Sequence, residues 1–271
     1  MRVFCDATAR PVTLAHPPVR IVSLVSSATE ALFALGLGDR VVGVSSYCSR
    51  YVPNLSVPVV GDYLRVDEEA LARLSPDLIL TTSGIQRGLA RRLAEAGQPV
   101  YALPLPASIH GVLEDLMLLG GLVGRLGAAR DLANEWYSAL IALRSAPPAR
   151  AARTFVEIWF GAHQRTVGGL SFITDLLEAA GLRGIYADEP LAYPAIDLAD
   201  VDRRAPERWV LFSEPEHPVD PAALAEERGW TGADIARTVI VSTVDRGRNI
   251  IHDGPSMVET ARWLHSLATR R

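Results

Sequence analysis

Residues 28–44 read ATEALFALGLGDRVVGV, and the pattern returns at residues 172–187 as FITDLLEAAGLRGIYA. Each has an acidic residue near a helix start, a Leu/Ala face, a Gly-Leu stop and a short apolar run. A second pair, EEALARLSPDLILTTSG (68–84) and LADVDRRAPERWVLFSE (198–214), repeats a short helix that ends at a proline and leads into a buried strand. The same two βα units in the same order predict two similar lobes, and a cleft between lobes is a common ligand site. The alternative is that turn and helix-stop residues common to all βα units repeat here by chance.

Apolar runs of strand length alternate with helical periodicity along the whole chain, which is typical of mainly parallel sheets flanked by helices. After a hairpin of residues 3–5 and 11–14, we expect strands at 20–25, 41–45, 57–63, 77–82, 99–104, 155–161, 209–212 and 238–244. The fold class is therefore α/β. We expect an N-terminal lobe of residues 1–125, a bridging helix of residues 126–148 and a C-terminal lobe of residues 149–271.

The bridging helix and the first helix carry specific expectations. Residues 128–145 hold strong helix formers without a breaker, and at 1.5 Å per residue they would span about 27 Å, enough to join two lobes rigidly. Near the first helix, the hydroxyls of Ser26, Ser27 and Thr29 can cap backbone N–H groups. Glu30 is expected in the positive first turn of that helix.

Composition excludes several classes of protein. The chain has 271 residues, 49% of them apolar and 21% charged, and a net charge of −4, so nothing indicates nucleic acid as a partner. All 27 cationic residues are Arg. Without lysine, a P-loop NTPase and a lysine Schiff-base enzyme are excluded.

Residues that could support catalysis or hold a metal do not cluster in the sequence. The six histidines form no metal-binding motif, and two cysteines, Cys5 and Cys48, cannot build a disulfide framework or a zinc cluster. No nucleophile elbow is present. We expect no catalysis, no bound metal and no resident cofactor.

No run approaches the ~20 apolar residues that span a bilayer, and no signal peptide is recognisable. The protein is expected to be periplasmic or in the cell envelope if a signal has been removed before Met1, and cytoplasmic otherwise.

A resemblance to the substrate-binding proteins of ABC importers for iron chelates and cobalamin lies in the stretch VFCDATARPVTLAHPPVRIVSLVSSATEALFALGLGDRVVGVSSY (3–47). Those proteins have a D-x-x-G-R-like hairpin turn, an R-I-V-S-L strand and an S-x-T-E helix start. Here the turn reads DATAR (6–10), with Ala9 where the family has Gly. The run SPDLILTTSG (75–84) is similar as well, and GVSSY (43–47) with GDY (61–63) matches the cobalamin-binding members.

This resemblance implies a corrinoid held between the lobes, with its cobalt carried by the ligand. Aromatic side chains offer contact area to a large, flat, partly apolar ligand, while hydroxyls and backbone N–H groups serve its amides. The implied ligand contacts are Ser26, Ser27, Tyr47, Tyr63, Ser83, Gly84, Trp159, Phe160, Tyr193 and Arg246. Trp159 and Phe160 could equally be core residues of a strand, since neighbouring strand residues face opposite ways.

The family also docks onto an ABC permease through one acidic residue on each lobe. Glu69 matches the first position. The second falls near Asp200, although the aligned residue is Ala199. Glu69 could instead simply favour the dipole of its helix.

The resemblance thus implies a monomeric binding protein that hands a small-molecule ligand to a permease. A ferric siderophore or haem is the alternative ligand within this class, and Arg65, Arg87 and Arg246 would suit an anionic siderophore. The alternative from another class is a cytoplasmic corrinoid carrier, sensor or enzyme on the same fold.

Overall fold

A computed structural model describes residues 1–160, 163–230 and 238–269. The chain divides into two compact units. The first comprises Met1–Pro106, His110–Trp136 and Asp253–Pro255, and the second Ala107–Ile109, Tyr137–His252 and Ser256–Arg271. The long helix α5 (Leu126–Arg144) contributes residues to both units. No described helix has an apolar stretch that would carry it across a membrane.

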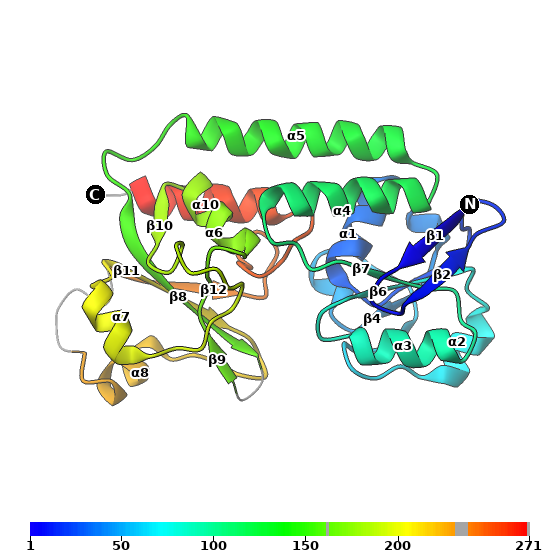
Figure 1. The fold of residues 1–271 in the computed structure, drawn as a ribbon, viewed down its shortest axis with the longest axis horizontal. Coiled ribbons are helices and arrows are strands. Elements are labelled where there is room, and N and C mark those ends of the chain that lie inside the picture. The colour runs from blue at the N-terminus through cyan, green and yellow to red at the C-terminus, as the bar shows by residue number, and fades with distance from the viewer. Residues whose placement is uncertain (161–162, 231–237, 270–271) are drawn as a thin grey trace. The chain divides into compact units, whose positions relative to one another are not determined.

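The first unit is built on a parallel five-stranded sheet in the order β5-β4-β3-β6-β7. Its strands are β3 (Ile21–Ser23), β4 (Val41–Ser45), β5 (Val59–Gly61), β6 (Leu78–Thr82) and β7 (Val100–Leu103). Its helices are α1 (Ser26–Ala34), α2 (Glu68–Leu74), α3 (Arg87–Glu95) and α4 (Ile109–Leu122). The chain runs from β3 outward to β5, then returns to β6 and continues to β7. Because such crossovers are right-handed, α1 lies on one face and α2 and α3 on the other (Figure 1).

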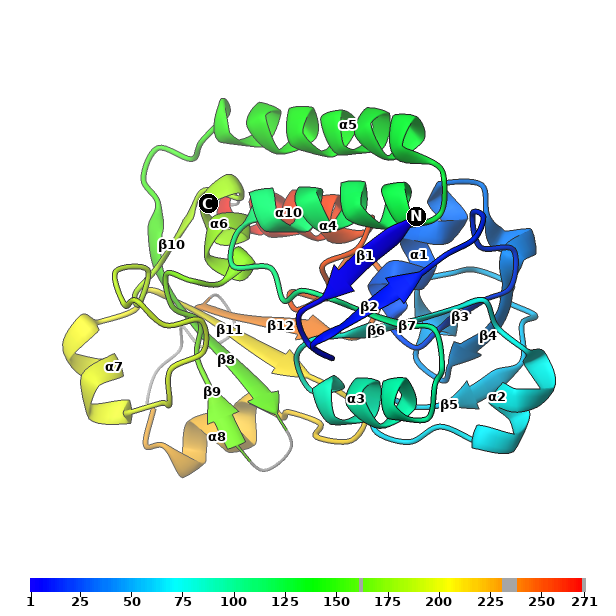
Figure 2. The ribbon, with the colours of Figure 1, turned by 45° about the vertical axis from the view of Figure 1, so that its right-hand side comes forward.

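The second unit repeats this topology, as the sequence pattern predicted. Its parallel strands follow the order β10-β8-β11-β12, which reproduces β4-β3-β6-β7, and a short antiparallel strand, β9, pairs with β8 (Figure 2). The strands are β8 (Ala152–Phe160), β9 (His163–Arg165), β10 (Leu182–Gly184), β11 (Arg208–Ser213) and β12 (Val239–Thr243). The helices include α6 (Phe172–Ala179), α7 (Leu198–Arg204), α8 (Pro221–Glu227) and α10 (Met257–Thr269). The α/β fold class is confirmed.

A specific set of hydrogen bonds joins α2 to the start of the sheet in the first unit. The helix ends at Ser75, which has a left-handed φ of 44°, just before Pro76. The Asp77 carboxylate then accepts hydrogen bonds from the backbone N–H groups of Val19 and Arg20, at 2.8 and 2.9 Å. The guanidinium of Arg20 donates to the carbonyl oxygen of Leu74 at 2.9 and 2.6 Å, which satisfies a helix-end acceptor.

The second unit uses equivalent residues in the same way. The helix α7 ends at Ala205 with φ 48° before Pro206. Glu207 accepts from the Arg153 N–H at 3.0 Å, and Arg153 Nε donates to the Ala205 carbonyl at 2.9 Å. The repeat read from the sequence therefore extends to the hydrogen bonds that connect helix and strand.

The start of α1 corrects one expectation. The N-cap is Val25, and no side-chain oxygen caps the helix. The hydroxyls assigned to capping lie inside the helix, where Ser26 contacts Tyr63 and Thr29 donates to the Val25 carbonyl at 2.9 Å. Glu30 falls beyond the first turn, which holds no acidic residue. The prediction was wrong because the helix begins at Ser26, immediately after the strand, so the hydroxyls come too late to cap it.

The N-terminal hairpin forms as expected from β1 (Arg2–Cys5) and β2 (Arg10–Thr13). Ala9 in its turn adopts a φ of 53°, a left-handed conformation that favours glycine. The glycine that the resemblance implies at this position would adopt this φ without strain. The bridging helix ends at Arg144, earlier than the expected residue 148, ahead of Pro147 and Pro148.

Candidate functional site

The carboxyl edge of the first sheet contains a topological switch point between β3 and β6. There the chain direction reverses, because β3 leads toward β4 while β6 leads toward β7. Open α/β sheets bind ligands outside the carboxyl ends of their strands at such points. Residues Val25–Ser27 leave β3 at this edge, and Thr82–Gly84 leave β6 beside them. Four of the expected contacts, Ser26, Ser27, Ser83 and Gly84, lie here.

Tyr63 and Tyr47 join Ser26 in one cluster. The hydroxyl of Tyr63 lies 3.0 Å from Ser26 Oγ, and either atom can donate the hydrogen bond. The Tyr47 and Tyr63 rings are 4.7 Å apart between centroids and tilted by 37°. The guanidinium carbon of Arg50 lies 4.7 Å from the centroid of the Tyr47 ring. The two tyrosines, far apart in the sequence and both half-buried, thus form one aromatic face.

The Tyr63 phenol is held in its neutral form. Burial raises its pKa, and this outweighs the hydrogen bond from Ser26, which lowers it. The cluster can therefore present an aromatic ring and hydroxyl groups to a ligand without a negative charge at this position.

Ser83 and Gly84 are fixed by the backbone of the next strand. The Ser83 N–H donates to the Leu103 carbonyl at 2.7 Å. A Cβ on Gly84 would lie 2.8 Å from Leu105 Cδ1, so only glycine leaves room for the present position of Leu105. Leu105 is 52% exposed and Ile85 is 64% exposed. Sequence reasoning missed these two apolar residues, although both directly follow strand ends and are thus near the edge where ligands bind.

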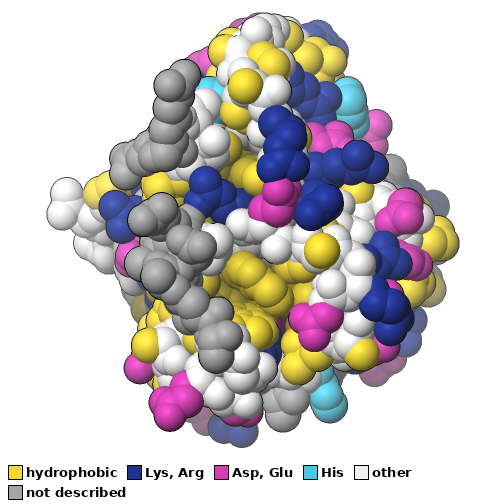
Figure 3. Space-filling model, turned by 90° about the vertical axis from the view of Figure 1, so that its left-hand side faces the viewer, with side chains coloured by type: hydrophobic (Ala, Val, Ile, Leu, Met, Phe, Trp, Pro, Cys, Tyr) yellow, Lys and Arg dark blue, Asp and Glu magenta, His cyan; other side chains and the backbone are white. Residues whose placement is uncertain are grey.

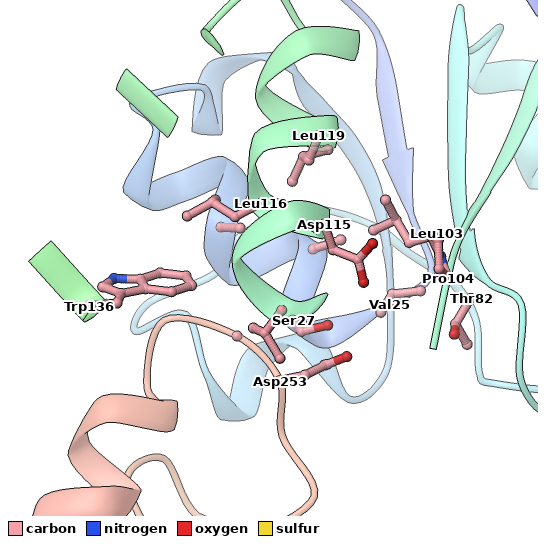
Figure 4. Close-up of a pocket in the computed structure, with 14 residues that line it drawn as sticks. Val25, Ser27, Thr82, Leu103, Pro104, Asp115, Leu116, Leu119, Trp136 and Asp253 are labelled. Atoms are coloured by element: carbon pink, nitrogen blue, oxygen red, sulfur yellow. The ribbon is translucent and has the colours of Figure 1, made fainter. Parts of the chain in front are cut away.

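A small cavity of about 30 Å³ opens at the same switch point. Figure 4 shows Asp115 of α4, Ser27 of α1 and Asp253 with their side chains on one side of it. The remaining labelled walls are mainly apolar, namely Val25, Leu103, Pro104, Leu116, Leu119 and Trp136, together with Thr82.

Asp115 is the most perturbed carboxyl group of this cavity. Burial raises its pKa to about 8, with smaller contributions from the negative charges of Asp253 and Glu114. A neutral Asp115 at pH 7 can donate a hydrogen bond. Sequence analysis missed Asp115 because it lies within an apolar helical run, and missed Asp253 because 138 positions separate the two residue numbers.

The remaining expected ligand contacts belong to the second unit. Tyr193 is half-buried in the loop before α7, and Arg246 is exposed and pairs with Glu259 at 2.9 Å. The backbones of Trp159 and Phe160 pair with Gln164 and His163 of β9. Their side chains lie outside the part of the chain that the structure describes.

The two carboxylates expected to dock onto a permease have different surroundings. The Glu69 side chain is 91% exposed on α2, with Arg73 at 3.8 Å. The Asp200 carboxylate is engaged within its own unit by Arg204 at 2.9 Å and Arg203 at 3.0 Å. On the face of the second unit in Figure 3, acidic and basic side chains lie side by side rather than forming a field of one sign.

The described residues contain no group of three or more His, Cys, Asp or Glu placed to hold a metal ion. Cys5 and Cys48 are both buried and unpaired with each other. The Cys48 thiol lies 3.1 Å from Thr29 Oγ1, and burial raises its pKa, so it remains a thiol rather than a reactive thiolate.

The sequence is similar to a known protein family and to proteins that have been named. The sequence pattern of the periplasmic binding protein family matches residues 21–243. A cobalamin-binding protein of Halobacterium salinarum is 34% identical over 187 residues, which is 68% of this chain and 50% of that protein. The matched region thus spans about half the length of that relative.

Two solved structures share the fold. The periplasmic vitamin B12 binding protein BtuF of Vibrio cholerae superposes with a TM-score of 0.68 at 22% identity, covering 93% of this chain and 97% of that one. The periplasmic heme binding protein HutB of the same organism gives a TM-score of 0.76 at 19% identity, covering 93% and 99%.

Proposed function

This chain belongs to the periplasmic binding protein family, and from that premise we propose that it captures a corrinoid such as cobalamin and delivers it to an ABC importer. The relative from Halobacterium salinarum, named as a cobalamin-binding protein, supports this choice of ligand. The exposed carboxylate of Glu69 supports a docking role toward a permease.

One observation carries the choice of a corrinoid, namely the neutral aromatic cluster of Tyr47, Tyr63 and Ser26 at the switch point. A corrinoid is flat and partly apolar, with amide arms around its rim. The two tilted tyrosine rings supply contact area at low entropic cost, and their hydroxyls together with Ser26 can hydrogen-bond amides.

Haem and ferric siderophores are less well served by the same cluster. A phenolate that ligates ferric iron requires a Tyr with a low pKa, whereas burial raises the pKa of Tyr63 and its hydroxyl is paired with Ser26. Of the three arginines that would suit an anionic siderophore, Arg246 is paired with Glu259. Arg65 and Arg87 are exposed, so the siderophore is included among the comparison ligands. Because HutB shares the fold, the fold alone does not distinguish between these ligands. Haem and a ferric siderophore are therefore tested beside the corrinoid.

In this proposal the protein acts by binding alone. It makes or breaks no bonds, it has no resident cofactor, and cobalt arrives within the ligand. It works as a monomer in the cell envelope. The alternative from another class, a cytoplasmic corrinoid carrier, sensor or enzyme, predicts instead that the native protein fractionates with the cytoplasm, which immunoblotting of separated cell fractions would show.

Isothermal titration of the protein with cyanocobalamin tests the ligand. We expect saturation near one ligand per chain. Haemin and a ferric hydroxamate siderophore, titrated under the same conditions, serve as comparison ligands. No heat with cyanocobalamin at tens of micromolar, together with saturation by either comparison ligand, would replace the corrinoid assignment.

A further inference from the structure

The cavity at the switch point is placed at the start of α1. Its lining includes Val25, Ser27, Ala28 and Ala31 of this region. The first turn of any helix has backbone N–H groups without intrahelical partners. In α1 no side chain caps them, and the whole turn is buried, with Ser26 at 4% and Ala28 at 2% exposure. This end of the cavity therefore favours a hydrogen-bond acceptor.

Ser27 gives a second and independent indication of a ligand. Its side chain lines the cavity and the residue is only 9% exposed. Among the residues that the structure describes, none forms a hydrogen bond with its hydroxyl. Because Ser27 Oγ is not among the buried side-chain atoms without a partner, it is open to the cavity, where it can hydrogen-bond a group that enters.

The carboxyl groups that line the same cavity favour a hydrogen-bond donor. Asp115 and Asp253 contribute the carboxyl groups there, and no described lining residue is basic (Figure 4). An anion would suit the start of α1 but would be repelled by Asp253. A cation would suit the carboxyl groups but would face the positive end of the helix.

A neutral group with an acceptor beside a donor satisfies both the start of α1 and the carboxyl groups. We infer that the cavity is a subsite for a primary carboxamide, whose carbonyl oxygen faces the start of α1 and Ser27, and whose NH2 group faces Asp115 and Asp253. The inference rests on the proposed function, in which the carboxamide is one of the amide arms at the rim of the corrinoid.

The size of the cavity agrees with this. A water needs about 10–15 Å³ of such space, so the cavity of about 30 Å³ holds a pair of waters or the polar end of one amide arm. The apolar walls, including Leu103 and Leu116, would then contact the methylene groups of the arm.

Three small probes of matched shape test the subsite without a corrinoid: propionamide, propionate and propylammonium. Ligands this small are expected to bind with a Kd on the order of 1–10 mM. In two-dimensional NMR titrations we expect propionamide alone to give saturable shifts at Ser27, Asp115 and Asp253. The inference would be overturned if propionate or propylammonium bound as tightly as propionamide or more tightly. It would also be overturned if propionamide caused no saturable chemical-shift changes.

Two variants of Asp115 separate the amide from a cation. Asp115→Asn keeps a donor and an acceptor, so propionamide should still bind within about threefold, whereas a cation would be lost. Asp115→Leu removes both and should weaken propionamide about tenfold, as expected for the loss of a buried hydrogen-bond partner. Glu114→Gln removes a neighbouring exposed carboxylate of the same helix and is the matched control, with affinity expected to be unchanged.

Ser27→Ala provides a second readout that does not depend on Asp115. We expect it to weaken propionamide binding several-fold while the melting temperature stays close to that of the wild type, because the Ser27 hydroxyl forms no hydrogen bond with another described residue. Equal affinity of Ser27→Ala and the wild type would contradict the placement of the carbonyl.

Titration with cyanocobalamin keeps the two proposals distinguishable. If cyanocobalamin binds the wild type and Asp115→Leu equally, the corrinoid assignment stands and the subsite falls. If propionamide binds as expected and cyanocobalamin does not, the carboxamide subsite stands and the corrinoid assignment falls.

Discussion

The hydroxyl oxygen of Tyr63 lies 3.0 Å from Oγ of Ser26, which joins the turn after β5 to the first residue of α1. The contact brings an aromatic ring from the outer strand to the switch point at the centre of the sheet. It also occupies one of the hydroxyls that the sequence assigned to helix capping. The same pair of residues thus explains why aromatic side chains lie at the edge of the sheet where ligands are expected.

Tyr63→Ala should weaken cyanocobalamin binding by about 1–3 kcal/mol, the usual cost of removing an aromatic anchor from a binding site. Tyr63→Phe keeps the ring and should cost less than Tyr63→Ala. Isothermal titration measures both. Tyr137→Ala, which removes an exposed tyrosine from α5, is the control. Unchanged affinity of a folded Tyr63→Ala protein would remove this residue from the site.

Glu69→Ala should leave ligand affinity unchanged but reduce import of labelled cyanocobalamin by cells that carry the cognate permease. The reason is that the Glu69 side chain is 91% exposed and its ion pair with Arg73 is long, at 3.8 Å, so its carboxylate is accessible to a partner. Glu95→Ala on α3 is the matched control. Import by Glu69→Ala at the wild-type rate would reduce Glu69 to a solvated helix residue.

Replacing Arg228 should destabilise the second unit strongly. Arg228 and Glu157 form a bidentate pair at 2.7 Å in both hydrogen bonds, and their side chains are 8% and 0% exposed. Arg228→Met leaves the Glu157 charge buried without its partner, which typically costs about 3–5 kcal/mol. Urea denaturation measures this loss.

The double replacement Glu157→Leu/Arg228→Met is expected to recover most of that stability, because no buried charge remains. The exposed Glu69–Arg73 pair supplies the comparison, since breaking it should cost about 0.5 kcal/mol or less. A double variant no more stable than Arg228→Met would show that packing, and not the unpaired charge, sets the cost.

Ala9→Gly and Ala205→Gly should each stabilise the protein by about 0.5–1 kcal/mol, because both alanines have a left-handed φ that strains any residue with a Cβ. Ala199→Gly, inside α7, should have the opposite effect by a similar amount. Thermal unfolding compares the three. A loss of stability on Ala9→Gly would show that the turn is not strained.

Stability should fall between about pH 4 and pH 8 because of Asp115. Its pKa is raised to about 8 in the folded protein, from 3.8, so over this range the folded state holds a proton that the unfolded state has released. The contribution is complete below the unfolded pKa and is lost as the pH rises through the folded one. Asp115→Asn should therefore gain stability relative to the wild type at pH 8 but not at pH 4. Urea denaturation at both pH values measures this gain, and Asp131→Asn, which changes an exposed carboxylate of α5, is the control. An equal difference between Asp115→Asn and the wild type at the two pH values would contradict the prediction.

Local patterns in the sequence were sufficient to predict most of the elements and their order, but not the three-residue strands β9 and β10. The run DLILTT at 77–82 became β6 as expected. The helix α2 before it is capped by Asp67, which accepts a hydrogen bond from the Ala70 N–H at 2.9 Å. The exact start of α1 was not predictable, because Ser26, Ser27 and Thr29 all have hydroxyls, and the choice among them depends on where β3 ends.

The candidate site, too, could be predicted from the sequence only in part. Tyr47 and Tyr63 could be proposed from loops that follow strands, since loops at strand ends commonly bind ligands. The contact between the two rings, and the contact of Tyr63 with Ser26, could not be predicted, because both depend on how β4 and β5 pair. Leu105 and Ile85 carried no periodic signal that would set them apart from core residues.

The duplicated βα pattern was sufficient to predict that each half builds a mainly parallel sheet, since hydrophobic periodicity and helix stops act over a few neighbouring residues. The strand order, with its reversal between β3 and β6, came only from the structure. The meeting of Ser27, Asp115 and Asp253 around one cavity depended on the folded chain, because these residues come from α1, α4 and a segment near the C-terminus. Burial there raises the pKa of Asp115. Such a shift depends on neighbours that packing brings together, so no local stretch of the sequence contains it.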